Sequence, residues 1–589
     1  MAKSTIIDIE DLHATSLGEK AGQCNCGNTQ CSDGCPKEKP IPELNHSLSA
    51  IRKLSKFGSF DQFQEAEWER FEKAFTAHEI EQLQDAFRIQ ARSTPFFGFT
   101  GRICPAPCQS ACTRRSRKQS SGEYDPPVQI KSIEDDLFFI GQHFGWFDES
   151  FYAPDVKTGK QVMVVGSGPA GIEAAYWLRA QGHDVTIFER SSRPGGLLRY
   201  GVPDSKLAKP VIDFYFRQME RMGITVAVNA EVHQEDGWFT VTNTKTSEKT
   251  VLPVQPDAVI LAIGVTDAPR LPRIEGIAGV KGVVQAMDYL TRANEAKYHE
   301  EQRLPYENPL DFGKEKVVVV GGGDTGADAI HTAALQISQQ QMKSERGGVL
   351  HATDRQPLKG TIPPVGNAWP NVPETIDYYR QKSMTSVEAK DHSMVAPVAV
   401  RTDADGNLTH VQIEHLKLRF PYMASLPKLQ RQMVRDETKG ERGTEWIETS
   451  KLVLALGFEG VRGNHLIQEL GLTCDGQGNL VDVLHNRTKK NAIYVAGDAD
   501  PVQHPGTVPK AKDWLVVDAQ ASAARCAESV HRDLSRKKEI SWEEARTEAS
   551  HYSWGKNAAV SLAQSYKHIQ VAYDHGASSS VSQPHDLGW

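Results

Sequence analysis

Residues 161–190 read QVMVVGSGPAGIEAAYWLRAQGHDVTIFER, and this stretch decides the fold. It runs from an apolar strand through a glycine turn and a helix to a second strand. Gly166, Gly168 and Gly171 have the G-x-G-x-x-G spacing, which permits a tight turn, close approach of a pyrophosphate and close packing of helix on strand. The next strand ends at Glu189, where a carboxylate can accept hydrogen bonds from ribose hydroxyls. The stretch therefore predicts a dinucleotide-binding βαβ unit, with Ala170 at the start of its helix.

Further glycines suggest which dinucleotide binds there. The loop SSRPGGLLRYGVPDSKL (191–207) follows the acid, and the strands ILAIG and NAIYVAGD come later. A paired glycine lets the backbone pass close to a bulky ligand, and Asp498 offers a carboxylate to the ribityl or phosphate side of a flavin. This set resembles the FAD site of flavoproteins with two dinucleotide-binding domains. Its predicted members beyond the first turn are Gly195, Gly196, Leu197, Gly264, Gly497 and Asp498.

A second glycine turn repeats the pattern in KVVVVGGGDTGADAIHTAALQ (316–336). Here we expect NAD or NADP, placed to pass hydride to the flavin. The predicted contacts are Gly321, Gly323, Asp324, Thr325 and Gly326. In the following strand Asp354 favours a free 2′-hydroxyl and hence NADH, whereas the adjacent Arg355 would meet the 2′-phosphate of NADPH or be an ordinary solvated arginine.

Composition excludes several classes of protein. The 589 residues carry 67 basic and 75 acidic side chains, a net charge of −8, so a nucleic-acid partner is not expected. The chain has neither a run of about 18 apolar residues nor a secretory signal, so we expect no membrane partner and a cytoplasmic location.

Seven of the nine cysteines lie in the first 112 residues. Cys474 and Cys526 are isolated, and we interpret them as packing or surface residues. No redox-active Cys-x-x-Cys pair accompanies the flavin turns, so electrons must leave the flavin by a route other than a disulfide.

The clustered cysteines follow short repeated spacings. Zinc sites favour Cys-x2-Cys knuckles, whereas short spacings with a proline after the last cysteine are typical of iron–sulfur proteins. We therefore favour iron–sulfur clusters over zinc. Seven thiolates are one short of two four-iron clusters, so another residue must complete the set. The candidate ligands are Cys24, Cys26, Cys31, Cys35, Cys104, Cys108 and Cys112.

The predicted class is α/β, with a helical iron–sulfur domain followed by two Rossmann-like domains, the NAD(P) domain being inserted into the FAD domain. Between the cysteine groups, residues 61–90 have the apolar spacing of an amphipathic helix. The predicted units are the helical domain 1–155, the FAD domain 156–310 and 458–535, the NAD(P) domain 311–457, and a C-terminal extension 536–589.

Several motifs together identify a family. TGRICPAPCQSAC, PPVQIKSIE, PGGLLRYGVPDSKL, GGGDTGAD and VAGD make the chain, from about residue 20 to 530, resemble the small (β) subunit of bacterial glutamate synthase. The same module occurs in dihydropyrimidine dehydrogenase. The resemblance implies FAD, NAD(P)H and two [4Fe–4S] clusters. It assigns Cys24, Cys26, Cys31 and Cys112 to one cluster, and Cys35, Cys104, Cys108 and Glu134 to the other.

Two departures from the family pattern concern the cofactors. The family has Cys-x2-Cys-Gly at its start, whereas here Cys24 lies one position later, which puts the first cluster's geometry in doubt. The segment after Gly497-Asp498 is several residues longer than in the family. The NAWPNVP segment (367–373) resembles NADH-type relatives and shifts the expected nicotinamide slightly toward NADH.

The resemblance implies an electron-input subunit. NAD(P)H gives hydride to FAD, and single electrons pass through the clusters to a large FMN and iron–sulfur subunit that makes glutamate from glutamine and 2-oxoglutarate. No protein side chain is assigned as catalytic, because the flavin mediates the hydride transfer. Two alternatives stay open: the same module serving another redox partner, and a non-catalytic scaffold that binds zinc and a dinucleotide.

Overall fold

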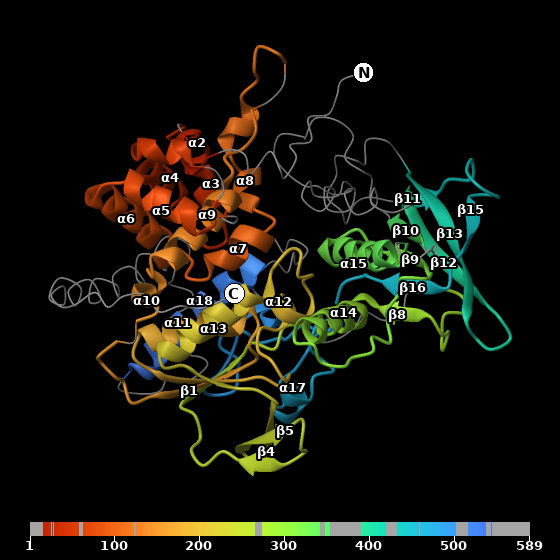
Figure 1. Cartoon of the computed structure of the whole chain (residues 1–589). Helices are drawn as coiled ribbons and strands as arrows, with labels where there is room; N and C mark the ends of the chain where they lie inside the picture. The colour runs from red at the N-terminus through yellow and green to blue at the C-terminus, as the bar shows by residue number, and fades with distance from the viewer. Residues whose placement is uncertain are drawn as a thin grey trace.

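The chain forms a helical N-terminal part and two parallel sheets with helices (Figure 1). The computed structural model describes residues 16–24, 26–27, 29–57, 60, 63–122, 125–152, 154–265, 274–341, 348–353, 390–419, 433–458, 460–501, 516–536 and 544.

The N-terminal part contains the helices α2 (Leu17–Gly22), α3 (Gln30–Asp33), α4 (Ile41–Ala50), α5 (Glu65–Ala74), α6 (Ala77–Ser93), α7 (Phe97–Ile103), α8 (Pro107–Ser110), α9 (Ile130–His143) and α10 (Phe147–Ser150). The single helix expected over 61–90 is wrong, because it is broken between α5 and α6. Thr76 starts α6 with a capping box, in which its hydroxyl accepts from the Glu79 N–H and the Glu79 carboxylate accepts from the Thr76 N–H. The extended backbone at Phe75 ends α5, and the reciprocal cap at Thr76 then starts α6 without changing the apolar spacing.

The first sheet carries the opening glycine turn. Its strands β1 (Gln161–Val165), β2 (Asp184–Phe188), β3 (Thr225–Ala227), β7 (Ala258–Leu261) and β17 (Ile493–Val495) are parallel, in the order β17-β7-β1-β2-β3. Helices α11 (Pro169–Ala180), α13 (Lys209–Arg221) and α18 (Val516–Leu534) accompany it, and the four-residue α12 (Leu197–Tyr200) lies nearby. Because β17 pairs with β7, the chain returns to this sheet after building the second one.

The second sheet is also parallel, with the order β11-β10-β9-β16-β8. It consists of β8 (Val283–Gln285), β9 (Lys316–Val320), β10 (Gly348–Thr353), β11 (Lys390–Ser393) and β16 (Lys451–Leu454), with helices α14 (Ala286–Glu301) and α15 (Asp324–Gln341). An antiparallel sheet adjoins it, made of β12 (Val395–Thr402), β13 (Leu408–Leu418), β14 (Met433–Arg435) and β15 (Thr444–Glu448).

A small antiparallel sheet extends the first glycine-turn unit. It consists of β4 (Ala230–Glu235), β5 (Trp238–Asn243) and β6 (Lys249–Val251), and helix α17 (His465–Glu469) packs on β4. The predicted α/β class with parallel sheets is confirmed. The proposed unit boundaries stay predictions, and nearly all of the extension 536–589 lies outside the described residues.

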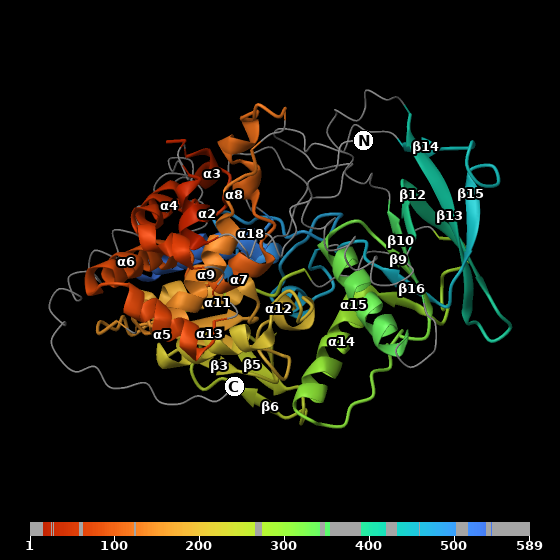
Figure 2. The same cartoon turned by 45° about the horizontal axis from the view of Figure 1, so that its top comes forward.

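The helical part and the first sheet share one hydrophobic core. The Tyr215 ring on α13 lies 5.2 Å from that of Phe96 and 5.6 Å from that of Phe147, and its hydroxyl accepts from the Gly98 N–H at 2.9 Å. A buried ion pair, Lys37 to Glu173 at 2.5 Å, joins the same two parts. In Figure 2 the helical part accordingly lies against α11 and α13, and the second sheet lies apart from it.

The contact between His183 and His531 predicts that acid lowers the stability of the fold where α18 packs. The two rings approach at 2.9 Å, from Nε2 to Nδ1, and burial followed by the charge of His531 lowers the pKa of His183 to about 4. As pH falls the unfolded chain binds this proton first, so the stabilisation is complete above about pH 6.5 and is lost toward pH 4. We expect the melting temperature of His183→Asn to fall less steeply than wild type from pH 7 to 4.5. The exposed His78, replaced in the same way, should leave the wild-type slope unchanged.

Candidate functional site

The first glycine turn has the geometry that its spacing predicts. Gly166 has a φ of 101°, and a Cβ there would lie 2.4 Å from the Ala262 carbonyl oxygen. A Cβ on Gly171 would lie 1.9 Å from the Gly166 oxygen, whereas one on Gly168 would meet no described atom within 4 Å. Helix α11 begins after Gly168 with no side-chain cap among the described residues. Its first N–H groups and the open space at Gly168 therefore fit a phosphate group.

Glu189 is buried beside this turn. One of its oxygens accepts from the Ser167 N–H at 3.1 Å and from the Ser167 hydroxyl at 2.5 Å, and the other accepts from the Ser191 N–H at 2.8 Å. Ser167 in turn accepts from the Gly195 N–H at 2.9 Å. Glu189 thus positions the turn, and its contact with a ribose stays a prediction. Sequence reasoning missed Ser167, for which the only signal was a hydroxyl inside the glycine motif.

The distant glycines converge on the same turn. Gly196 has a φ of 52°, and a Cβ on it would lie 2.8 Å from the Gly168 Cα. A Cβ on Gly497, whose φ is 70°, would lie 2.6 Å from the Ala170 Cβ. Two segments far apart in sequence therefore approach the start of α11, as the FAD prediction requires.

The other predicted flavin residues lie on the neighbouring loops. Leu197 begins α12 directly after the glycine pair and is 46% exposed. Gly264 follows β7 with a φ of 68°, and a Cβ there would meet no described atom within 4 Å. Asp498 lies in the turn Gly497–Ala499, which follows β17.

A buried polar network supports the Gly497–Asp498 turn. The Ser522 hydroxyl on α18 accepts from the Gly497 N–H at 3.1 Å and donates to Asp500 at 2.8 Å. The side-chain amide of Asn486 donates to the same Asp500 oxygen at 2.9 Å. Because buried hydrogen-bonded groups hold one arrangement, this network fixes the backbone at the place predicted for the flavin. Sequence reasoning did not find these three residues, since they come from separate segments.

The second glycine turn repeats the geometry of the first. Gly321 has a φ of 135°, and a Cβ there would lie 2.1 Å from the Ala455 oxygen. A Cβ on Gly326 would lie 2.3 Å from the Gly321 oxygen, and one on Gly323 would meet no described atom within 4 Å. Asp324 and Thr325 open α15. Asp354 and Arg355 lie outside the described residues, so the nicotinamide preference stays open.

The two glycine turns belong to units that contact each other. Lys206, between α12 and α13, makes a buried ion pair with Asp328 on α15. The Ser205 hydroxyl oxygen lies 2.7 Å from Nε2 of His331 on the same helix. Burial raises the pKa of Asp328 to about 6, although Lys206 opposes the shift. These contacts hold α15 against the loop that follows the flavin glycine pair.

Four of the seven clustered cysteines line one small cavity, which is partly open to solvent. They are Cys24, Cys26, Cys31 and Cys112, the set that the family resemblance assigned to one cluster. Burial raises the pKa of Cys31 to about 11, and the neighbouring thiols add to the shift. Thiols that resist ionisation become thiolates when a metal supplies positive charge, so these residues fit a cluster. Cys24 lines this cavity although it lies one position later in the sequence than the family pattern places it.

The other cysteines gather around a buried ion pair. Cys35, Cys104 and Cys108 lie within electrostatic reach of Lys39, whose ammonium contacts the Glu134 carboxylate. Burial raises the pKa of Cys104 to about 12. Although burial opposes its charge, Glu134 and then these cysteines hold the pKa of Lys39 above its usual range. Sequence reasoning missed Lys39, which places a cation inside this second group.

Glu134 itself is held by three side chains. The Thr100 hydroxyl donates to Oε2 at 2.6 Å, and the Gln90 amide donates to Oε1 at 3.3 Å beside Lys39. Glu134 is thus placed with the second cysteine group, but it would have to exchange one of these partners to bind iron. Its role as the eighth ligand stays a prediction.

The remaining cysteines lie elsewhere. Cys526 is fully buried in α18 and Cys474 is half-buried, as expected for packing residues. All nine cysteines are among the described residues, and none forms a disulfide. The described helices include none whose length and apolar character would suit a passage through a bilayer.

Several known proteins are similar in sequence to this chain. Residues 160–513 match the family described as pyridine nucleotide-disulphide oxidoreductase. The glutamate synthase [NADPH] small chain of Bacillus subtilis is 32% identical over 71% of this chain and 76% of its own length. That of Mycobacterium tuberculosis is 30% identical over 87% of this chain and 88% of its own.

A shorter match extends the comparison to a second enzyme. The NAD-dependent dihydropyrimidine dehydrogenase subunit PreT of Escherichia coli is 32% identical over 39% of this chain and 48% of its own. The long matches to the small chains, together with the two glycine turns, decide the assignment. The chain belongs to the glutamate synthase small-chain family of FAD-dependent pyridine nucleotide oxidoreductases.

Proposed function

We propose that this protein is the electron-input subunit of a glutamate synthase, taking electrons from NAD(P)H and delivering them through two iron–sulfur clusters to a large partner subunit. The observation that carries the proposal is the gathering of seven cysteines into two groups within a helical part that shares its core with the flavin-type sheet. The names of the small-chain relatives support a large partner.

When bound, FAD would supply hydride acceptance and the release of single electrons, and iron–sulfur clusters would carry those electrons. The protein's part is to bind and to orient. The first turn and the start of α11 hold the flavin pyrophosphate, and the second turn and α15 hold the nicotinamide dinucleotide. The contacts of Lys206 and Ser205 with α15 fix the two turns relative to each other.

Anaerobic purification together with the large subunit tests this function. In the small chain purified alone under the same conditions, without the FMN and iron of the large subunit, we expect about one FAD and about eight iron atoms, since two four-iron clusters need that number. NADH or NADPH should bleach the absorbance near 400 nm. Glutamate should form from glutamine and 2-oxoglutarate only when both subunits are present, and the two nicotinamides compared there decide the preference.

Single cysteine variants test the two groups separately. Cys31→Ser and Cys108→Ser should each lose about four iron atoms, because each removes a ligand of a different cluster. Cys474→Ser, outside both groups, is the control and should keep the full content. Zinc without iron or sulfide would contradict the proposal and favour a zinc-binding scaffold. Full iron and flavin without glutamate formation would instead favour another redox partner.

A further inference from the structure

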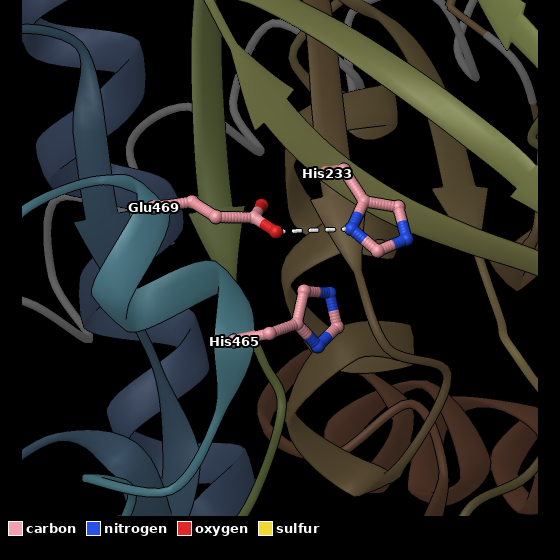
Figure 3. Close-up of side chains that lie close together, drawn as sticks. All are labelled: His233, His465 and Glu469. Atoms are coloured by element: carbon pink, nitrogen blue, oxygen red, sulfur yellow. Dashed lines mark hydrogen bonds and ion pairs between the residues drawn. The ribbon is translucent and has the colours of Figure 1, made fainter.

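Three side chains of the types that bind metals meet between β4 and α17, and none of them belongs to a cysteine group (Figure 3). One donor atom each from His233, His465 and Glu469 lies within 4.8 Å of the other two. His233 Nδ1 is 3.0 Å from Glu469 Oε1, and the two imidazole rings are 4.4 Å apart. The side chains are 21%, 37% and 26% exposed, so an ion can reach them from solvent.

The local structure explains why these side chains converge. His465 and Glu469 are four residues apart on α17, which puts them on one face of the helix. His233 lies on β4, the edge strand of the small sheet, and alternation puts Glu231 on the same face of that strand. A helix pair and a strand residue therefore supply ligands from two rigid elements.

Surrounding groups hold the ligands in orientation. Glu469 Oε2 accepts from the Gln234 N–H at 2.8 Å, which directs Oε1 toward His233. One nitrogen of His465 is 3.1 Å from the Val232 carbonyl oxygen, and the other is 3.9 Å from Glu231. A metal bound at Nδ1 would leave the Val232 contact in place as the usual outer contact of a metal-bound histidine, whereas a metal bound at Nε2 would replace it.

We propose that His233, His465 and Glu469 form a binding site for Zn²⁺ or a chemically similar transition-metal ion. Two imidazoles and one carboxylate are a typical zinc donor set, whereas Mg²⁺ and Ca²⁺ prefer oxygen ligands. Ligands of a tetrahedral zinc ion lie about 3.3 Å apart, so the donors need to move only slightly. Two carboxylates, Glu231 and Glu469, balance the charge of a divalent ion beside neutral imidazoles.

The site would join two distant segments of the chain. β4 precedes the second sheet and α17 follows it, so a bound ion would fasten the small sheet to the segment that leads back into β17. The two cysteine groups contribute nothing to it, and this inference is independent of the proposed electron transfer.

Zinc titration of the complete protein, loaded with FAD and its clusters, tests the site. By calorimetry with ZnCl₂ alone, wild type should bind one ion at this site, and MgCl₂ should give no such binding. Glu469→Gln and His465→Gln should each weaken zinc binding by at least about 100-fold, more than the loss of an outer-shell partner costs. Glu469→Gln is the sharper variant, because its amide oxygen can still accept from the Gln234 N–H.

The control is a histidine–carboxylate pair without a third ligand. His143 lies 2.7 Å from Glu72, and that pair is not part of a three-residue donor group among the described residues. His143→Gln should bind zinc as wild type does, and zinc should raise the melting temperature of wild type and this control only. Equal zinc binding by Glu469→Gln and wild type at equal iron content would place the ion elsewhere and overturn the proposal. Absence of zinc binding to wild type would also overturn it, leaving His233 and Glu469 as a plain hydrogen-bonded pair.

Discussion

Replacing Gly171 by alanine should leave the protein without bound FAD. The added Cβ would lie 1.9 Å from the Gly166 backbone oxygen, a contact that cannot be relieved by moving a flexible side chain. The turn or the start of α11 must shift, and such overpacking costs about 1–3 kcal/mol or more, so FAD affinity should fall at least about 10- to 100-fold. Flavin absorbance per chain after desalting measures the loss.

A matched variant in the second turn separates the two nucleotide sites. Gly326→Ala creates a similar contact, 2.3 Å from the Gly321 oxygen, and should keep FAD while losing reduction by NAD(P)H. Circular dichroism of both variants checks that they remain folded. Retention of FAD by Gly171→Ala with loss by Gly326→Ala would show that the two turns were assigned to the wrong dinucleotides.

Replacing Lys39 by methionine should destabilise the helical part severely. Lys39 and Glu134 are both buried and contact each other, so the variant leaves a buried carboxylate without its cation. Breaking a buried ion pair from one side costs about 3–5 kcal/mol. The urea midpoint for loss of helical circular dichroism, measured on iron-free protein so that Glu134 binds no cluster, should fall correspondingly.

Two further variants identify the cause. Lys39→Met combined with Glu134→Leu removes both charges and should recover most of the midpoint, because apolar replacement of a whole buried pair is often nearly neutral. Lys73→Met breaks the exposed pair with Glu69 and should cost only about 0.2–0.5 kcal/mol. If the urea midpoint of Lys39→Met equals that of wild type, another group must balance the charge of Glu134. The ion pair with Lys39 would then not be what stabilises this carboxylate.

The sequence could predict whatever depends on short-range spacing. The glycine turns were predictable because each demands particular backbone conformations within six residues, and Gly166 and Gly321 both adopt them. The grouping of the cysteines came from the family resemblance, and the shared cavity agrees with it for one group.

Features that depend on partners distant in the chain could not be predicted. Lys39 reads as an ordinary charged residue until folding places it beside Glu134, 95 positions later. The second sheet lies between the segments of His233 and Glu469 in the sequence. The two residues meet only because the chain returns beside β4 after building that sheet. The break between α5 and α6 was local, but the continuous apolar spacing concealed the capping box at Thr76.

The core shared by the helical part and the first sheet limits how this protein can be divided. Cutting the chain near residue 155 would expose aromatic faces such as those of Phe96 and Tyr215, and would separate Lys37 from Glu173. The helical part that carries the cysteines thus belongs to the same packed unit as the flavin-type sheet. An engineer who wished to move these cysteines into another protein would have to transplant the sheet with them.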